Sequence, residues 1–295
     1  MSVVKKAIIT DAGFASRYLP ITKTIPKGMM PIGAKPAMQL CIEECIEAGI
    51  EEIIIVATPG TKAREIYDDY FHNSAENVKA LLDKQGKPER FLPVEEVFNF
   101  PKIIVIEQDA TLPYGNGSPI VSAKEFVKDE EAFVVLYSDD LVLGSSDVKT
   151  LVENYESHPG IKGVIVGQRM PSEVWKKYGM IAMKDGNMLS HIVEKPKTPE
   201  LSPSDLASYG RYLLTPEIFD YLIPSNTGLD DELWTTDAIT KLAETGDVLV
   251  AESAGKWITT GDPKNYFLAH LEYAMKYSDY ADEIEECYNK IKENK

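Results

Sequence analysis

Short runs rich in isoleucine and valine alternate with segments of helical periodicity through the first half of this chain. The runs predict strands near Val4–Ile9, Ile53–Ala57, Ile103–Glu107 and Phe133–Tyr137. The periodic segments between them predict helices over Ala37–Ala48, Thr61–Phe71 and Ala75–Lys84. Such a β-α-β-α succession predicts an α/β fold with a largely parallel sheet and helices on both faces.

The second half shows short apolar runs joined by turns. They predict strands over Ile161–Gly167, Gly179–Met183, Met188–Glu194 and Ser208–Leu214. The turn at Lys184–Asn187 is typical of a hairpin, so this half is expected to be more antiparallel. It is also expected to cover one side of a functional site built on the parallel half. Helices are expected over Pro216–Leu222, over Thr236–Glu244, and from Pro263 to the end of the chain. The connection Gln85–Pro101 holds three prolines and is predicted to be irregular.

Composition and charge exclude several classes of partner. A net charge of −16 over 295 residues argues against a nucleic-acid polymer, because phosphate backbones attract basic surfaces. No apolar run reaches about 18 residues, so no membrane span is expected, and the first residues lack the apolar core of a signal peptide. The three cysteines lack zinc-ligand spacing and predict reduced thiols in a cytoplasmic protein.

One loop of the predicted sheet is unusually basic. Between Ala12 and Ile42 the chain has no carboxylate, although its acid content would place roughly five in such a window. The cations in this window are Arg17, Lys23, Lys27 and Lys35. A backbone that can approach a ligand at Gly13, followed by fixed cations, suits a polyphosphate. An irregular loop with solvated lysines fits the charge pattern equally well.

Two familiar phosphate-binding motifs are absent from this loop. No G-x-G-x-x-G follows the first strand, and the segment Gly28–Lys35 departs from a P-loop. Its lysine is displaced by one position, no serine or threonine follows it, and Pro31 interrupts it. A phosphate site here must therefore be of another type.

Two carboxylates, Asp139 and Asp140, follow the predicted strand Phe133–Tyr137. Ligands of parallel sheets bind at the carboxyl ends of the strands, and hard oxygen ligands there commonly hold Mg²⁺. A turn or a helix N-cap would use aspartate equally well. The basic loop also begins at a strand end, so the carboxylates are expected in the same crevice as the cations, which favours the metal.

Two further segments carry candidate contacts. The loop Leu112–Pro119 contains Gly115 and either brings backbone close to a base or sugar or forms an ordinary turn. Glu194 and Lys195 end another predicted strand, where a lysine can contact a phosphate and a glutamate can accept sugar hydroxyls. A surface ion pair is the alternative for these two residues.

These motifs together resemble those of the bacterial UTP–glucose-1-phosphate uridylyltransferases, also called UDP-glucose pyrophosphorylases. The resemblance rests on Ala12–Pro36 and on landmarks in the family's order, which are Gly115–Gly117, Asp139–Asp140, Tyr178–Gly179, Val193–Lys197, Gly210–Tyr212, Asp231–Glu232 and Thr236–Ile239. It covers roughly residues 4–275. Several independent motifs at the family's spacing make it specific.

The resemblance implies a Rossmann-like mixed α/β fold with a mainly parallel sheet, of the nucleotide-diphospho-sugar transferase type. One nucleotidyltransferase domain would span residues 1–265. Its nucleotide-binding part would lie at about 1–145 and its sugar-binding part at about 146–265. C-terminal helices over 266–295 would follow as an oligomerisation element, so a homo-oligomer is expected.

The resemblance also implies substrates, a cofactor and a role for each site residue. The substrates would be UTP and glucose 1-phosphate, joined by in-line attack on the α-phosphorus with the help of Mg²⁺. The implied nucleotide contacts are Ala12, Gly13, Gln108 and Gly115, and the implied phosphate-binding cations are Arg17 and Lys27 for UTP and Lys195 for glucose 1-phosphate. Asp139 would ligate the metal. The implied glucose contacts are Gly179, Glu194, Gly210 and Glu232.

Three departures from the family's pattern bear on activity. Ala15 and Ser16 stand where the family has a glycine and a threonine, and alanine disfavours a positive φ. Gly28 stands where the family has a glutamate. Thr259 stands where the family has the second carboxylate on the metal, so the affinity for Mg²⁺ is expected to fall unless Asp140 or Asp262 compensates.

The departures leave functions of different classes open. The first is a Mg²⁺-dependent uridylyltransferase that makes UDP-glucose. The second is a catalytically weakened paralogue that binds nucleotide-sugar and regulates or associates with an active enzyme. The third is a transferase of the same class that uses another nucleotide or another hexose phosphate.

Overall fold

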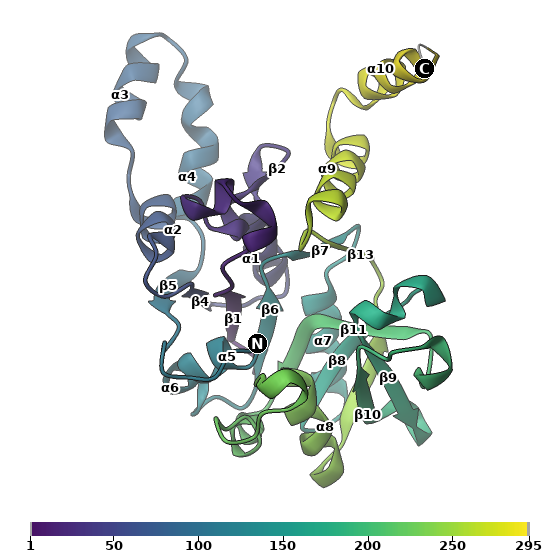
Figure 1. Ribbon diagram of the computed structural model, residues 1–295. Coiled ribbons are helices and arrows are strands. Elements are labelled where there is room, and N and C mark those ends of the chain that lie inside the picture. Colours follow the sequence, from purple (N-terminus) through teal and green to yellow (C-terminus); the bar gives the residue numbers. More distant parts are fainter. Residues whose placement is uncertain (1, 294–295) are drawn as a thin grey trace.

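The computed structural model describes residues 2–293, in which helices pack on both faces of one large sheet (Figure 1). The helices are α1 (Ala37–Glu47), α2 (Ala63–His72), α3 (Glu76–Lys84), α4 (Leu92–Phe98), α5 (Ser118–Ser122), α6 (Lys124–Val127), α7 (Asp147–Ser157), α8 (Thr235–Thr245), α9 (Pro263–Tyr277) and α10 (Ala281–Glu293). Residues 1, 294 and 295 lie outside the described range, and with them the outermost ends of the predicted segments 1–265 and 266–295.

The main sheet has nine strands in the order β5-β4-β1-β6-β11-β8-β12-β10-β9. In chain order its strands are β1 (Lys6–Asp11), β4 (Glu52–Ala57), β5 (Lys102–Glu107), β6 (Phe133–Tyr137), β8 (Gly163–Arg169), β9 (Gly179–Lys184), β10 (Met188–Glu194), β11 (Leu206–Leu214) and β12 (Val248–Glu252). Two small ribbons lie outside it and pair β2 (Pro31–Ile32) with β3 (Lys35–Pro36) and β7 (Asp140–Leu143) with β13 (Lys256–Thr259).

The first half of the sheet is parallel, as the sequence predicts. Strands β5, β4, β1 and β6 pair in parallel, and neighbouring residues of β1 face opposite sides. Ile9 packs into the core under α1, α2 and α7, whereas Ile8 packs into the core under α5, α6 and α8. Burial on both faces explains why these strands read as continuous apolar runs.

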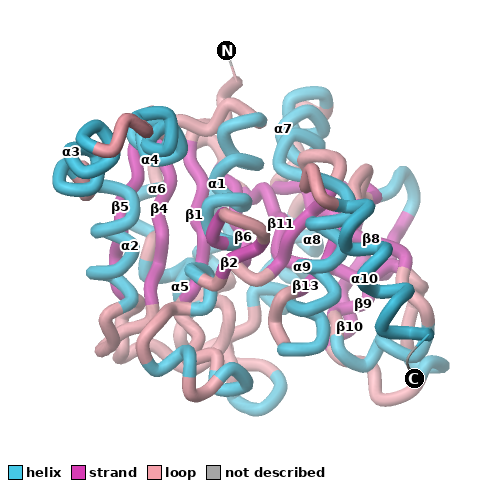
Figure 2. The backbone as a smooth tube through the Cα atoms, turned by 90° about the horizontal axis from the view of Figure 1, so that it is seen from above, coloured by secondary structure: helices cyan, strands magenta, loops and turns pink. Residues whose placement is uncertain are grey.

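The second half of the sheet is mainly antiparallel, which confirms the sequence prediction. Strand β11 runs antiparallel to β6 and to β8, and β9 and β10 form the predicted hairpin around Asp185–Asn187. Strand β11 also pairs with β9, so the pairings of β11, β8, β12, β10 and β9 form a closed ring. Figure 2 shows this half beside the parallel one.

One sequence prediction of local structure is wrong. The connection Gln85–Pro101 is helical in part, with a 3₁₀ turn at Pro88–Phe91 followed by α4. Pro88 and Pro93 occupy the first turn of these segments, where a missing N–H costs no hydrogen bond. The helix predicted over Pro216–Leu222 is present as a 3₁₀ helix over Pro216–Asp220.

The C-terminal segment forms two helices, α9 and α10, separated at Ser278–Tyr280. In Figure 1 they rise at the upper right, across from α3 and α4 at the upper left, and Figure 2 likewise places α10 on the side away from α3. Across residues 2–293, none of the helices combines the length and the apolar character needed to cross a bilayer. Cys41 and Cys45 are buried in the α1 core, Cys287 is exposed, and all three are free thiols.

Candidate functional site

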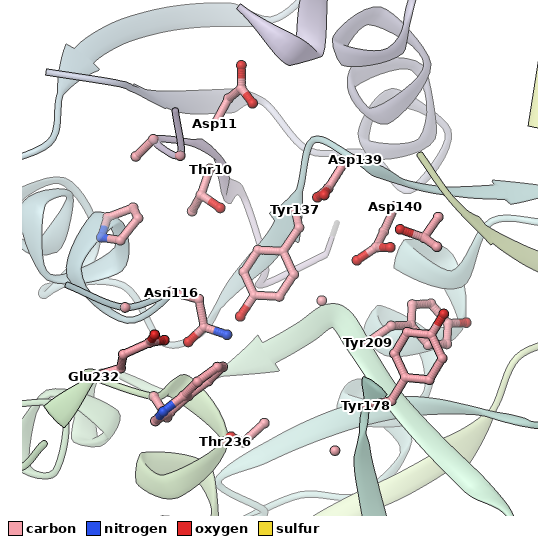
Figure 3. A pocket seen from close by; sticks show the side chains of 18 of the residues that line it. Thr10, Asp11, Asn116, Tyr137, Asp139, Asp140, Tyr178, Tyr209, Glu232 and Thr236 are labelled. Atoms are coloured by element: carbon pink, nitrogen blue, oxygen red, sulfur yellow. The ribbon is translucent and has the colours of Figure 1, made fainter. Parts of the chain in front are cut away.

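A cavity of about 590 Å³ lies at the carboxyl ends of the parallel strands. It is lined by residues from both halves of the chain, and in Figure 3 Asp139 and Asp140 approach it from the side opposite Glu232. Every residue to which the resemblance assigns a contact borders this cavity, namely Ala12, Gly13, Arg17, Lys27, Gln108, Gly115, Asp139, Gly179, Glu194, Lys195, Gly210 and Glu232. Lys23 and Lys35, the other cations of the basic loop, do not line it. Their positions range from residue 12 to residue 232, so the tertiary fold is what assembles them.

The basic loop between β1 and α1 folds into three short 3₁₀ turns, over Ser16–Tyr18, Ile21–Lys23 and Lys27–Met29. Ala15 precedes the first turn with φ 46° and ψ 45°, a left-handed conformation that costs a non-glycine residue about 1–2 kcal/mol. The Thr22 hydroxyl donates to the Ala15 carbonyl at 2.9 Å and holds it there. Alanine at this position therefore does not prevent the left-handed turn.

The start of the loop is tied to the segment that follows β13. The Arg17 Nη1 donates to the Gly261 carbonyl at 3.1 Å, and the Tyr18 hydroxyl donates to the Thr260 carbonyl. These bonds fix the loop relative to Thr259, which precedes Thr260 and also borders the cavity.

Asp11, at the end of β1, anchors the second part of the loop. Its buried carboxylate accepts hydrogen bonds from the Ser138 hydroxyl at 2.7 Å, the Gly28 amide at 3.1 Å and the Tyr67 hydroxyl. A Cβ at position 28 would collide with the Tyr67 hydroxyl. The local packing therefore requires a glycine at position 28, where the family has a glutamate. The hydrogen bonds to Asp11 hold the neighbouring Lys27 at the edge of the cavity.

Lys27 and Asp139 form an ion pair with Nζ 2.6 Å from Oδ2. Burial alone would lower the pKa of Lys27, but the carboxylates of Asp139 and Asp11 outweigh it and raise that pKa. Burial would also raise the pKa of Asp139, but Lys27 outweighs it and the pKa falls below its usual value. Both side chains are therefore charged at neutral pH.

The metal-binding potential of this corner is limited. A Cβ at Gly261 would lie 3.0 Å from Asp139 Oδ2 and 3.2 Å from Thr259 Oγ1, so this carboxylate and this hydroxyl border the same space. Within residues 2–293 there is no group of three or more His, Cys, Asp or Glu residues that could hold a metal ion. Mg²⁺ needs only one or two carboxylates when waters and substrate phosphates complete its shell. The donors fit a metal shared with a phosphate ligand and do not form a closed cage.

The two carboxylates suggested as substitutes for the missing ligand are engaged elsewhere. Asp140 Oδ1 accepts the Trp257 indole N–H at 2.7 Å, and burial and the charge of Asp139 raise the pKa of Asp140 to about 7. Asp262 is the N-cap of α9, where its carboxylate accepts the Asn265 amide at 3.0 Å and the Asn265 side chain at 2.6 Å. Neither carboxylate is free to replace the one that Thr259 lacks.

The opposite side of the cavity carries Glu194 and Lys195 from the end of β10. Glu194 accepts the Thr236 hydroxyl at 3.2 Å, and burial raises its pKa although Lys195 and Thr236 act in the other direction. The Lys195 ammonium lies over the Trp234 ring, 4.3 Å from its centroid. The alternative of a surface ion pair between Glu194 and Lys195 is therefore wrong.

The glycine loop borders the cavity and also packs on the segment before α8. Gly115 has φ 138°, and a Cβ there would collide with the Leu233 backbone. The Gly117 amide donates to the Leu233 carbonyl at 2.9 Å, and the Leu233 amide donates to the Tyr114 carbonyl at 2.7 Å. Asn116 Oδ1 accepts the amide and the hydroxyl of Thr235 at 2.9 and 3.1 Å.

Several cavity residues were missed in the sequence, among them Asn116, Tyr137, Trp234 and Trp257. Asn116 stands between two glycines of the candidate loop, and Trp234 follows Glu232 by two positions. Only this proximity in the sequence could have indicated that they belong to the site. Aromatic residues at the ends of strands and helices usually indicate core packing. Their exposure to a cavity depends on the path of the chain.

Comparisons with known proteins agree with this architecture. The model of the nucleotidyl transferase family matches residues 6–276. A UTP–glucose-1-phosphate uridylyltransferase of Bacillus subtilis (strain 168) is 37% identical over 289 residues, which cover 96% of each chain. UTP–glucose-1-phosphate uridylyltransferase 2 of Staphylococcus saprophyticus is 37% identical over 299 residues, which cover 100% of each chain.

Solved structures are similar over nearly the same range. A UDP-glucose pyrophosphorylase complexed with UDP-glucose superposes with a TM-score of 0.78 at 30% identity and covers 92% of this chain and 99% of its own. A UTP-bound UGPase from Acinetobacter baumannii superposes with a TM-score of 0.84 at 28% identity and covers 97% of this chain and 98% of its own.

Proposed function

The chain belongs to the nucleotidyl transferase family, and we propose that it is a UTP–glucose-1-phosphate uridylyltransferase. It makes UDP-glucose and pyrophosphate from UTP and glucose 1-phosphate. The observation that carries this function is one cavity that Arg17, Lys27 and Lys195 all border. Relatives of full length at 37% identity have this activity in their names, and the alternative of a weakened paralogue is not favoured.

The proposed roles follow from the charges around the cavity. Arg17 and Lys27 bind the phosphates of UTP, and Lys195 binds the phosphate of glucose 1-phosphate. The proposed uracil contacts are Ala12, Gly13, Gln108 and Gly115, and the proposed glucose contacts are Gly179, Glu194, Gly210 and Glu232. All of these residues border the cavity.

The reaction needs no protein nucleophile. A phosphate oxygen of glucose 1-phosphate attacks the α-phosphorus of UTP, the bond from that phosphorus to the bridging oxygen breaks, and pyrophosphate leaves. The reactants are both anions, so their mutual repulsion is the first barrier, and Arg17, Lys27 and Lys195 reduce it. Holding the attacking oxygen in line with the leaving group supplies further acceleration.

Enzymes of this family generally use a divalent metal, and we propose Mg²⁺ for this chain. Asp139 would hold it, with Thr259 as a neutral neighbour in place of a second carboxylate. When bound, the metal would neutralise charge on the phosphate oxygens. The single carboxylate predicts weaker metal binding than a pair of carboxylates would give.

We further propose that the chain forms a homo-oligomer through α9 and α10. Apolar side chains on α9 are exposed although the chain is strongly charged, with Phe267 74% and Leu271 41% exposed. Next to them a groove of about 690 Å³ is lined by aromatic residues, including Tyr266, Tyr273 and Tyr280. Apolar patches of this kind usually mark interaction sites. A cytoplasmic location is also proposed, supported by the free thiols.

Pyrophosphate release from UTP plus glucose 1-phosphate, with and without Mg²⁺ and beside the same assay with dTTP, tests the function. Release that depends on Mg²⁺ and prefers UTP is expected. Preference for dTTP or another hexose phosphate would assign a different transferase of the same class. No release despite measurable binding of UDP-glucose would overturn the enzymatic function.

A further inference from the structure

The ammonium of Lys195 is held by an aromatic ring and not by a carboxylate. Its Nζ lies 4.3 Å from the centroid of the Trp234 ring, and both residues border the cavity. A lysine over an indole face at this distance is within the range of a cation–π interaction. The contact therefore contributes to the position of the ammonium in the absence of substrate.

The backbone at Lys195 has a strained conformation. Lys195 has φ 46° and precedes Pro196, although non-glycine residues avoid this region and residues before proline favour extended backbone. Its amide donates to the Tyr178 carbonyl at 3.1 Å, which holds this conformation at the end of β10. Strained conformations of this kind persist where the surrounding structure fixes them, and they concentrate at ligand sites.

The Trp234 ring is itself fixed. The side chain is 8% exposed, and its indole N–H donates to the Leu229 carbonyl at 3.0 Å. Trp234 is the N-cap residue of α8, and the next residue is bonded to Asn116. The ring is therefore a rigid surface against which a flexible lysine can settle.

The carboxylate next to Lys195 in the chain has a hydrogen-bond partner of its own. Glu194 accepts the hydroxyl of Thr236 at 3.2 Å, although its charge still interacts with that of Lys195. An ion pair to this carboxylate would have to break before Lys195 could bind a phosphate. A π face attracts the charge and leaves N–H donors of the ammonium available for a phosphate.

We propose that Trp234 is a positioning residue that holds Lys195 ready for the phosphate derived from glucose 1-phosphate. The inference rests on the proposed function, because Lys195 has this role only in a sugar-phosphate site. Trp234 acts through Lys195 and not on the nucleotide, so its effect belongs to the sugar-phosphate substrate alone.

A matched pair of variants tests this role. Trp234→Leu and Trp234→Phe both lose the indole hydrogen bond to Leu229 and both remain apolar, but only phenylalanine keeps a π face. The KM for glucose 1-phosphate is expected to rise about tenfold in the leucine variant and about two- to threefold in the phenylalanine variant. The KM for UTP should stay unchanged in both. Thermal unfolding of the two variants should coincide, which controls for lost packing.

The same pair in a Lys195→Ala background separates positioning from other effects. Without the lysine, the leucine and phenylalanine variants should have the same KM for glucose 1-phosphate, because coupled residues lose their interaction energy together. A difference that persists without Lys195 would overturn the inference. Equal KM values for leucine and phenylalanine in the presence of Lys195, or an equal rise for UTP, would overturn it too.

Failure of the proposed function gives a different result. If the wild-type chain releases no pyrophosphate, the assignment of the enzyme fails. The positioning role is then read from the Kd for UDP-glucose, which does not depend on turnover. That Kd should rise in Trp234→Leu and much less in Trp234→Phe, and equal values would contradict the role of Trp234.

Discussion

The Nζ of Lys27 lies 2.6 Å from Oδ2 of Asp139, so the cation proposed to bind phosphate and the carboxylate proposed to hold the metal neutralise each other before substrate arrives. Only 17% of the Lys27 side chain and 25% of the Asp139 side chain is exposed. Each of the two largely buried charges therefore has a partner of opposite sign. This matters because burying a charge without a partner has a large free-energy cost. Substrate phosphates and the metal must then compete with an existing interaction.

Asp139→Asn should separate the two roles of this carboxylate. Turnover is expected to fall about 100-fold or more, because a group that supports charge in the transition state is lost. UTP binding without Mg²⁺ should become tighter, because Lys27 loses its carboxylate partner. Calorimetric titration of UTP in the presence of a chelator measures the second effect, with the exposed Asp83→Asn as control. Weaker metal-free UTP binding in Asp139→Asn would contradict this account of the ion pair.

Thr259→Asp should place a second carboxylate beside Asp139. The Mg²⁺ concentration needed for half-maximal activity is expected to fall about tenfold, because affinity for hard cations follows the charge of the ligands. Thr259→Asn is the control, since asparagine has nearly the same shape as aspartate without its charge. The measurement is activity as a function of the free Mg²⁺ concentration. If the aspartate and asparagine variants reached half-maximal activity at the same concentration, the added charge would not strengthen metal binding. If the aspartate variant were inactive with every substrate pair, weak metal binding would not be the only defect.

Glu194 should give the sugar site a pH dependence of its own. Burial raises its pKa, so on acidification the carboxylate proposed to accept sugar hydroxyls is protonated at a higher pH than an ordinary glutamate. The KM for glucose 1-phosphate should therefore rise at acidic pH more steeply in the wild type than in Glu194→Gln. The phosphate of the substrate titrates equally in both proteins, so the difference between their pH profiles isolates Glu194. Parallel profiles would rule out its role in sugar binding.

The same pKa shift predicts an effect on stability with a definite sign. A carboxyl group with a raised pKa in the folded state favours folding in its protonated form, so its contribution falls as pH rises from the unfolded pKa through the folded pKa. Glu194→Gln should consequently raise the melting temperature at neutral pH. The gain should shrink on acidification. A loss of stability at neutral pH would show that hydrogen bonding outweighs burial.

The buried pair of Arg211 and Glu44 should dominate local stability. Arg211 is fully buried and its Nη2 lies 2.6 Å from Glu44 Oε2, while Glu44 Oε1 accepts the amides of Asp147 and Val148 at 3.0 and 3.1 Å. Glu44→Ala should cost about 3–5 kcal/mol, because it leaves a buried guanidinium unpaired. Glu43→Ala removes the more exposed pair with Lys35 and should cost about 0–1 kcal/mol. Urea unfolding of both variants measures the loss in the free energy of unfolding. Similar losses would contradict the claim that burial makes the Arg211–Glu44 pair the more important one for stability.

Charge on the exposed face of α9 should weaken self-association. Leu271→Glu places a carboxylate where an apolar contact between copies is proposed, so light scattering should show a smaller mass than for the wild type. Val78→Glu, at an exposed apolar position of α3, is the control and should leave the mass unchanged. An unchanged mass in Leu271→Glu would exclude this face as the interface.

Local sequence patterns predicted the parallel half of the sheet well, because its strands are buried on both faces and read as continuous apolar runs. They failed at Gln85–Pro101, where prolines that usually break helices instead begin them. They also missed β7, β12, β13 and α7, whose short or mixed patterns carry little periodic signal. The basic loop, the two aspartates and the glycine loop were recognisable because each combines unusual residues at a strand end.

The sequence by itself determined which chemical groups the site contains and that most of them follow strands of one sheet. Tertiary structure decided which groups meet: Lys27 with Asp139, Lys195 with Trp234, and Asp140 with Trp257 instead of an open metal position. Such pairs join residues far apart in the chain, and their formation depends on side-chain direction and on the route of connecting segments. Neither property has a local periodic signal, so both become visible only when the sheet has assembled.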